Sequence, residues 1–176
     1  MIYVIIGVVL LVIIVPIFSV LPSARQRQQM AMRMAARGAG VSVELTTITD
    51  PNPNQDKYIS HIGKKIEPNL KVAAYRLQRR RANDWRQLPQ VNWCLKKDLA
   101  GAWHWQAPAD EAMSEELKAF LDQHVEALPE DTEQVQEVGY NIVVYWHERN
   151  PGDETTVFNF LRQCAALPLH KPQEEE

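Results

Sequence analysis

The chain has 176 residues and a formal net charge of −3, and this length favours one domain with a short additional segment. Residues 22–100 carry 15 Lys or Arg and 6 Asp or Glu, whereas residues 101–176 carry 4 and 16. Two cysteines are too few for a disulfide scaffold, and the acidic second half argues against a nucleic-acid-binding protein.

Residues 2–21 form an apolar run without a charged side chain. Twenty helical residues rise about 30 Å, the thickness of the hydrocarbon core of a bilayer, so the run predicts a membrane-spanning helix that tolerates Pro16. A buried core helix is one alternative, but such a helix seldom stays apolar on every face. A cleaved signal peptide is the other, but it would need a basic start and a small-x-small exit in place of VLPSA at residues 20–24.

Cationic residues closely follow the apolar run, and none precedes it in the sequence. They are Arg25, Arg27, Arg33 and Arg37. The positive-inside rule therefore predicts Met1 outside and the rest of the chain in the cytoplasm. Residues 25–37 predict a helix that ends near Gly38. This helix either lies among lipid headgroups, with its arginines near anionic lipid, or is a solvated spacer.

Alternation of apolar and polar residues then predicts half-buried strands. The pattern occurs in residues 41–46, 71–78 and 91–95. Trp103 and Trp105 suggest a short fourth strand, and residues 49–56 form a turn-rich break.

Two amphipathic helices are predicted in the acidic half. The first covers residues 110–128, with Asp110 as its cap and an acidic outer face, and the second follows Asp153 and ends before Pro168. Between them, residues 140–146 are apolar on both faces and predict a central strand.

This order of elements predicts an α+β domain with two helices packed on one side of a largely antiparallel sheet. We divide the chain into a transmembrane anchor (1–21), a basic juxtamembrane helix (22–40), the soluble α+β domain (41–169) and a disordered acidic tail (170–176).

The sequence contains no pattern that indicates a catalytic centre, a metal site or a bound cofactor. His147 and Glu148 follow the predicted central strand, but Pro151 stands where an HExxH motif has its second histidine. Cys94 and Cys164 lie among apolar residues, which favours core packing over a reactive thiolate.

An arginine run beside a tryptophan is the main candidate for an interaction surface. It consists of Arg79, Arg80, Arg81 and Trp85. Nucleic acid, anionic lipid or the acidic helix could each take up these cations, and the acidic second half disfavours nucleic acid. Of the five tryptophans, we expect Trp85 to be the exposed one, with the others in the core.

The first 45 residues resemble YajC, the single-pass accessory subunit of the bacterial preprotein translocase. The resemblance rests on the apolar span, the PSARQRQQ stretch at residues 22–29, Gly40 and the strand that follows. This chain is longer and lacks the glycine-rich strand-turn pattern expected after the basic helix. The whole chain, with VYWHER at residues 144–149, also resembles an uncharacterised group of bacterial inner-membrane proteins. The resemblance implies an inner-membrane location and no activity.

Our leading hypothesis is a non-enzymatic, single-pass inner-membrane protein. Its cytoplasmic domain would bind another protein and serve an envelope or protein-translocation assembly. The alternatives are a membrane-surface enzyme of unrecognised type and a domain that senses anionic lipid. A concave pocket holding convergent polar groups with perturbed pKa values would favour the enzyme.

Overall fold

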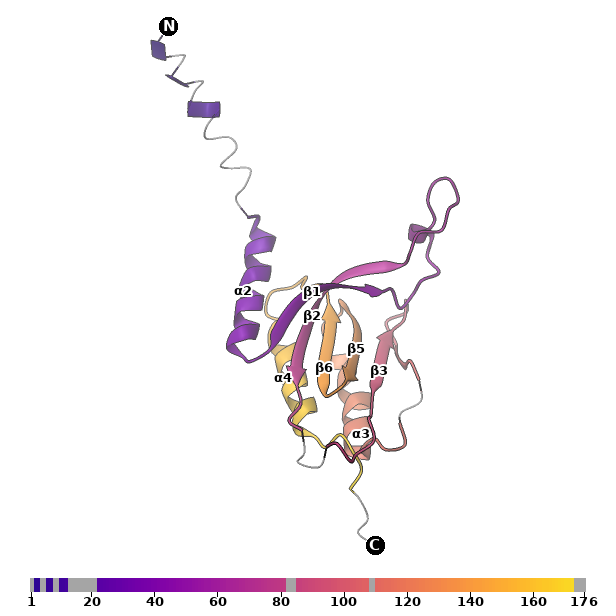
Figure 1. Cartoon of the computed structure of the whole chain (residues 1–176). Coiled ribbons are helices and arrows are strands. Elements are labelled where there is room, and N and C mark those ends of the chain that lie inside the picture. The colour runs from indigo at the N-terminus through magenta and orange to yellow at the C-terminus, as the bar shows by residue number, and fades with distance from the viewer. Residues whose placement is uncertain are drawn as a thin grey trace.

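The computed structural model describes residues 2–3, 6–7, 10–12, 22–81, 85–107 and 110–172. Most of the predicted span at residues 2–21 therefore lies outside the described residues. Within the described ranges, no helix is both long enough and apolar enough to cross a bilayer. In Figure 1, the chain from residue 22 onward forms a twisted sheet with two helices behind it and one helix at its edge.

The sheet has six strands in the order β1-β2-β6-β5-β3-β4, and every neighbouring pair is antiparallel. The strands are β1 (Ser42–Thr49), β2 (Asn69–Gln78), β3 (Trp93–Lys97), β4 (Trp103–Trp105), β5 (Thr132–Val138) and β6 (Asn141–Trp146). The predicted α+β fold with an antiparallel sheet is confirmed. The strand predicted to be central, now β6, is indeed enclosed between β2 and β5.

The main core lies between one face of this sheet and helices α3 (Glu115–His124) and α4 (Glu154–Ala166). The α4 stripe of Val157, Phe158 and Leu161 is buried, as its helical spacing predicts. From β2, Tyr75 packs edge-on against Trp146 with ring centroids 5.3 Å apart. The Tyr75 ring also stacks on Phe158 of α4 with ring centroids 6.1 Å apart, so this packing joins the middle of β2 to α4.

Helix α2 (Ala24–Gly38) belongs to the same packed unit. A capping box starts it, with Ser23 and Gln26 bonding each other's backbone N–H groups. Met32 and Ala36 are 3% and 0% exposed in the main core. This helix, predicted as a juxtamembrane segment before a domain that starts at residue 41, buries an apolar face against β1 and α4.

Three local predictions also differ from the structure. Strand β5 was not expected, and Tyr140, predicted to start a strand, occupies the β5–β6 turn with a φ of 65°. The first amphipathic helix begins at Glu115 because Asp110 instead forms a turn, its side chain accepting the Ala112 N–H. In the predicted disordered tail, the backbone of Lys171 bonds to Ala112, and residues 173–176 lie outside the described residues.

Candidate interaction groove

A groove of about 820 Å³ lies where β2 and α4 end. Its walls come from the chain after β2, the β5–β6 turn and the segment after α4. The described lining is Arg79, Arg80, Arg81, Leu88, Tyr140, Ala165, Ala166, Leu167, Pro168, Leu169, His170 and Lys171. The lining combines four cationic side chains with apolar surface and includes no carboxylate among the described residues. Such a volume falls within the range of ligand pockets.

The groove lies far from the start of α2. Residues Gln29 and Arg33 of α2 share a surface recess with Thr47 of β1, so α2 runs antiparallel to that strand and begins beside its Thr49 end. Ser42, at the other end of β1, pairs with Arg76 of β2, which is three residues before the groove residue Arg79. Figure 1 shows the same arrangement, with the start of α2 at the upper end of the domain and the ends of β2 and α4 at the lower end.

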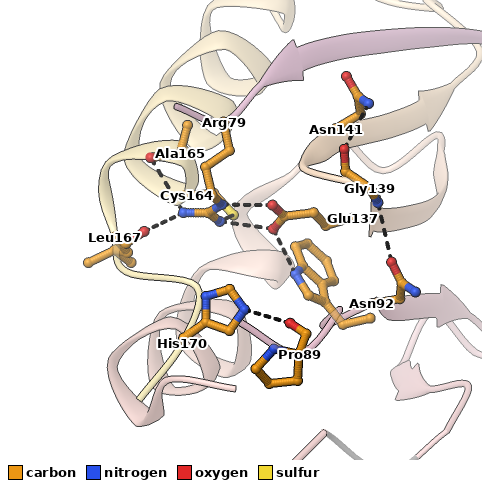
Figure 2. A network of polar contacts seen from close by, with 11 residues as sticks. Arg79, Pro89, Asn92, Glu137, Gly139, Asn141, Cys164, Ala165, Leu167 and His170 are labelled. Atoms are coloured by element: carbon orange, nitrogen blue, oxygen red, sulfur yellow. Dashed lines mark hydrogen bonds and ion pairs between the residues drawn. The ribbon is translucent and has the colours of Figure 1, made fainter. Parts of the chain in front are cut away.

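Arg79 forms the buried floor of the groove (Figure 2). Its Nε and Nη2 donate to the two carboxylate oxygens of Glu137 at 2.7 and 2.9 Å. Trp93 Nε1 donates to the same carboxylate at 2.9 Å, and Arg79 also bonds to the backbone oxygen of Leu167. Arg79 is 4% exposed and Glu137 is 0% exposed. Assigning Arg79 to an interaction surface was therefore wrong, because its guanidinium neutralises a buried carboxylate.

Burial alone would lower the pKa of Arg79, but the hydrogen bonds and charge of Glu137 overcome that cost and raise it above its ordinary value. The guanidinium therefore stays charged. Nε and Nη2 of the guanidinium bind the two oxygens of the Glu137 carboxylate, which is the bidentate arrangement typical of arginine–carboxylate pairs. Arg79 consequently ties β2 to β5 and to the end of α4, and holds the groove floor in place.

Arg80 and Arg81 lie above this floor and are exposed. The guanidinium carbon of Arg81 is 4.5 Å from the ring centroid of Trp85 and 5.5 Å from that of Tyr140, which is within cation–π range. The Trp85 and Tyr140 rings meet edge-on with centroids 6.1 Å apart. Trp85 is only partly exposed, because it packs against the core beside Tyr140. Of the three consecutive arginines, Arg79 is therefore part of the buried structure, whereas Arg80 and Arg81 are exposed at the rim of the groove.

The opposite rim comes from the segment after α4. His170 Nε2 donates to the backbone oxygen of Pro89 at 2.9 Å, because a carbonyl oxygen can only accept. Lys171 Nζ lies 3.0 Å from the Glu115 carboxylate at the start of α3. These contacts hold the rim against α3 and the segment before β3.

Neither cysteine offers a thiolate. Burial and the Glu137 charge raise the pKa of Cys164 to about 12, despite the nearby Arg79. Burial also raises the pKa of Cys94. Nucleophilic cysteines need lowered pKa values, so both thiols stay protonated near neutral pH.

The other predicted site residues lie on α2. Arg25, Arg27 and Arg37 are exposed, whereas Arg33 turns toward the domain and binds Glu148. Arg33 was predicted with the other three to lie near lipid, but its charge is taken up by the 2%-exposed Glu148.

Several residues with central roles were not singled out from the sequence. Glu137 lies in the unexpected strand β5, and Tyr140 was assigned to a strand. Glu137 lies within the polar stretch before the β5–β6 turn and Tyr140 lies in the turn itself, for which Gly139 is a local signal. His147, considered beside Glu148, instead contacts Glu133 at 3.1 Å.

Comparison with known proteins gives no relative. No protein-family model matches this chain, and no curated protein or solved structure matches it either. The resemblance of the N-terminal region to YajC stays a prediction.

Proposed function

We propose that this chain is a single-pass membrane protein whose α+β domain binds a segment of another protein in the groove. Residues 2–21 would anchor it, with the domain in the cytoplasm, as the flanking arginines Arg25, Arg27 and Arg37 favour. The resemblance to YajC supports a bacterial inner membrane and a role beside an envelope or protein-translocation assembly. The observation that carries this proposal is the place of the groove at the end of the domain remote from the start of α2.

The lining indicates the chemistry of the partner. Arg80, Arg81 and Lys171 supply cations, while Tyr140 and Leu167 supply apolar surface. Arg and aromatic side chains are typical centres of protein interfaces. An extended segment with carboxylates and at least one large apolar side chain would match both features. Arg79 takes no direct part, since Glu137 and the backbone occupy its donors.

A membrane-surface enzyme receives less support from the groove. Its buried polar groups, Arg79 and Glu137, bind each other, and Cys164 beneath them keeps its proton. An enzyme would instead place a nucleophile or base with a suitably shifted pKa toward bound substrate. The cationic and apolar rim favours recognition of a peptide.

Photo-crosslinking in cells tests the proposal. A photoreactive residue would replace Arg80 in the full chain, and a matched chain would carry it at Arg149, an exposed arginine outside the groove. We expect one discrete protein adduct from position 80 and none of that identity from position 149. Adding Arg81→Glu should lower the yield at least about tenfold, because charge reversal opposes an acidic segment.

Identical adducts from both positions, or no protein adduct from position 80, would contradict the proposed groove. An adduct whose yield is unchanged by Arg81→Glu would contradict an acidic partner segment. Circular dichroism of each variant would show that the fold is unchanged, which the exposure of both positions leads us to expect.

A further inference from the structure

The connection between β1 and β2 carries a small hairpin, residues 58–66, that projects from the sheet (Figure 1). Ile66 N–H donates to the Tyr58 oxygen at 2.8 Å, and Ser60 N–H donates to the Lys64 oxygen at 2.9 Å. Gly63 closes the tip with a φ of 77°, a left-handed conformation that favours glycine. These backbone bonds give the 58–66 hairpin a defined shape.

A buried polar cluster fixes the base of the 58–66 hairpin. Asp50 is 3% exposed and accepts a hydrogen bond from the Tyr58 hydroxyl. Its Oδ2 also forms an ion pair with Lys57 Nζ at 2.9 Å. Its backbone N–H bonds to the Pro68 oxygen at 2.7 Å, which joins the two ends of the connection. The hairpin is therefore held in place where it leaves the sheet.

The tip displays an unusual amount of apolar surface. Three isoleucines within this short hairpin are exposed: Ile59 by 51%, Ile62 by 74% and Ile66 by 52%. Isolated exposed apolar residues are ordinary, but a group of β-branched residues on a structured projection marks an interaction site. Lys64 and Lys65 are exposed beside them.

The 58–66 hairpin lies at the end of the domain where α2 begins. It follows the Thr49 end of β1, and α2, antiparallel to that strand, starts beside the same end. Figure 1 shows the start of α2 and the hairpin at the same, upper end of the sheet. The exposed cations at this end include Arg25 and Arg27 on α2 and Lys64 and Lys65 on the hairpin, while the exposed acidic residues Asp56 and Glu67 flank the hairpin in the sequence.

We propose that the 58–66 hairpin is a second membrane contact, inserting its isoleucines among the headgroups of an anionic bilayer. This inference rests on the anchor in the proposed function, which brings this end of the domain to the membrane. Apolar side chains partition into the interface while neighbouring lysines bind anionic headgroups. Because α2 is packed on the domain, the anchor and the hairpin would contact the membrane at two points of the same end of the domain. The groove, at the other end, would then face away from the lipid.

Fluorescence of a labelled full chain in lipid nanodiscs tests the contact. The polarity-sensitive probe NBD would be attached at Ile62→Cys or, as a control, at Val138→Cys, each with Cys94→Ser; Cys164 is 0% exposed. Val138 is also apolar and 49% exposed, but it is the last residue of β5, beside the β5–β6 turn at the groove end. Discs of phosphatidylcholine with phosphatidylglycerol would carry spin-labelled acyl chains as quenchers.

We expect blue-shifted, quenched emission from the probe at position 62 and water-like, unquenched emission at position 138. Quenching at position 62 should be lower in discs of phosphatidylcholine alone and in the Lys64→Gln/Lys65→Gln variant. Equal quenching in all three cases would overturn the selection of anionic lipid. Water-like emission at position 62 would overturn the membrane contact, and would also be the outcome if the isoleucines served a protein partner instead.

Retention of the chain with the discs during size-exclusion chromatography reports on the anchor separately. Retention with a water-like probe at position 62 overturns only the hairpin contact. Loss of retention overturns the anchor, and the spectrum with excess anionic vesicles then decides the hairpin: a blue shift supports it and no shift overturns it.

Discussion

Arg33 of α2 and Glu148 after β6 are 115 positions apart in the chain, yet Nε of the arginine lies 2.9 Å from Oε1 of the glutamate. A second arm of the guanidinium contacts Oε2, and the Tyr75 hydroxyl donates to Oε1 at 2.8 Å. Glu148 has a φ of 54°, a left-handed backbone that is uncommon outside glycine. The helix that follows the predicted span is thus joined to the sheet by a polar contact as well as by Met32 and Ala36.

Replacing Arg33 should weaken this junction. Arg33→Ala leaves the carboxylate of Glu148 buried with only the Tyr75 hydroxyl as a partner, and we expect the free energy of unfolding to fall by about 2 kcal/mol. Chemical denaturation of the full chain in detergent, followed by circular dichroism, measures the change. Arg37→Ala on the same helix is the control, because its side chain is exposed. Equal losses in both variants would contradict the junction.

The extent of the folding unit gives a second prediction. A fragment of residues 22–172 should unfold in one cooperative thermal transition with mixed α and β circular dichroism. A fragment of residues 41–172 lacks Met32, Ala36 and Arg33, so it should melt at a lower temperature or without cooperativity. Coincident melting curves would show that α2 adds nothing to the core.

The arginine run gives a third prediction. Arg79→Ala leaves the fully buried Glu137 without its cation, and should lower the free energy of unfolding by about 3–5 kcal/mol. Arg80→Ala, one residue along the chain, should change it by less than about 0.5 kcal/mol, because that side chain is exposed. Urea titration of both variants compares them directly. A stable Arg79→Ala protein would refute the structural role of this ion pair.

Thiol reactivity gives a fourth prediction. Because the pKa of Cys164 is raised to about 12, its thiol stays protonated at lower pH, and burial also denies access to reagent. At pH 8, Ellman's reagent should therefore leave Cys164 unreacted in the folded chain and modify both cysteines in guanidinium chloride. Rapid native labelling of Cys164, identified by peptide mass, would show that α4 is not packed as described.

The sequence predicted the elements whose signal is local. Helix α4 has the apolar spacing of Val157, Phe158 and Leu161, and β6 is apolar on both faces because it lies inside the sheet. Strand β5 could not be recognised in the same way, since TEQVQEV contains more polar than apolar residues. Its buried Glu137 is stabilised by Arg79, which directly follows β2 and lies 58 positions away, so no local pattern indicates the pair.

The same limit applies to the candidate site. A row of three arginines indicates an exposed basic surface, and only the tertiary position of Glu137 shows that Arg79 is buried. Likewise, Arg33 was grouped with its exposed neighbours because its partner Glu148 is distant in the chain. The grouping of three exposed isoleucines became visible only once the 58–66 hairpin was seen to project from the sheet.

Alkaline carbonate extraction of cell membranes tests the central claim, that residues 2–21 hold this domain at a membrane. The full chain and a chain that begins at Pro22 would be expressed in parallel, and their pellets and supernatants compared by immunoblotting. We expect the full chain to stay in the membrane pellet, because a spanning helix resists extraction, and the shorter chain to enter the supernatant. Release of the full chain into the supernatant would contradict the claim.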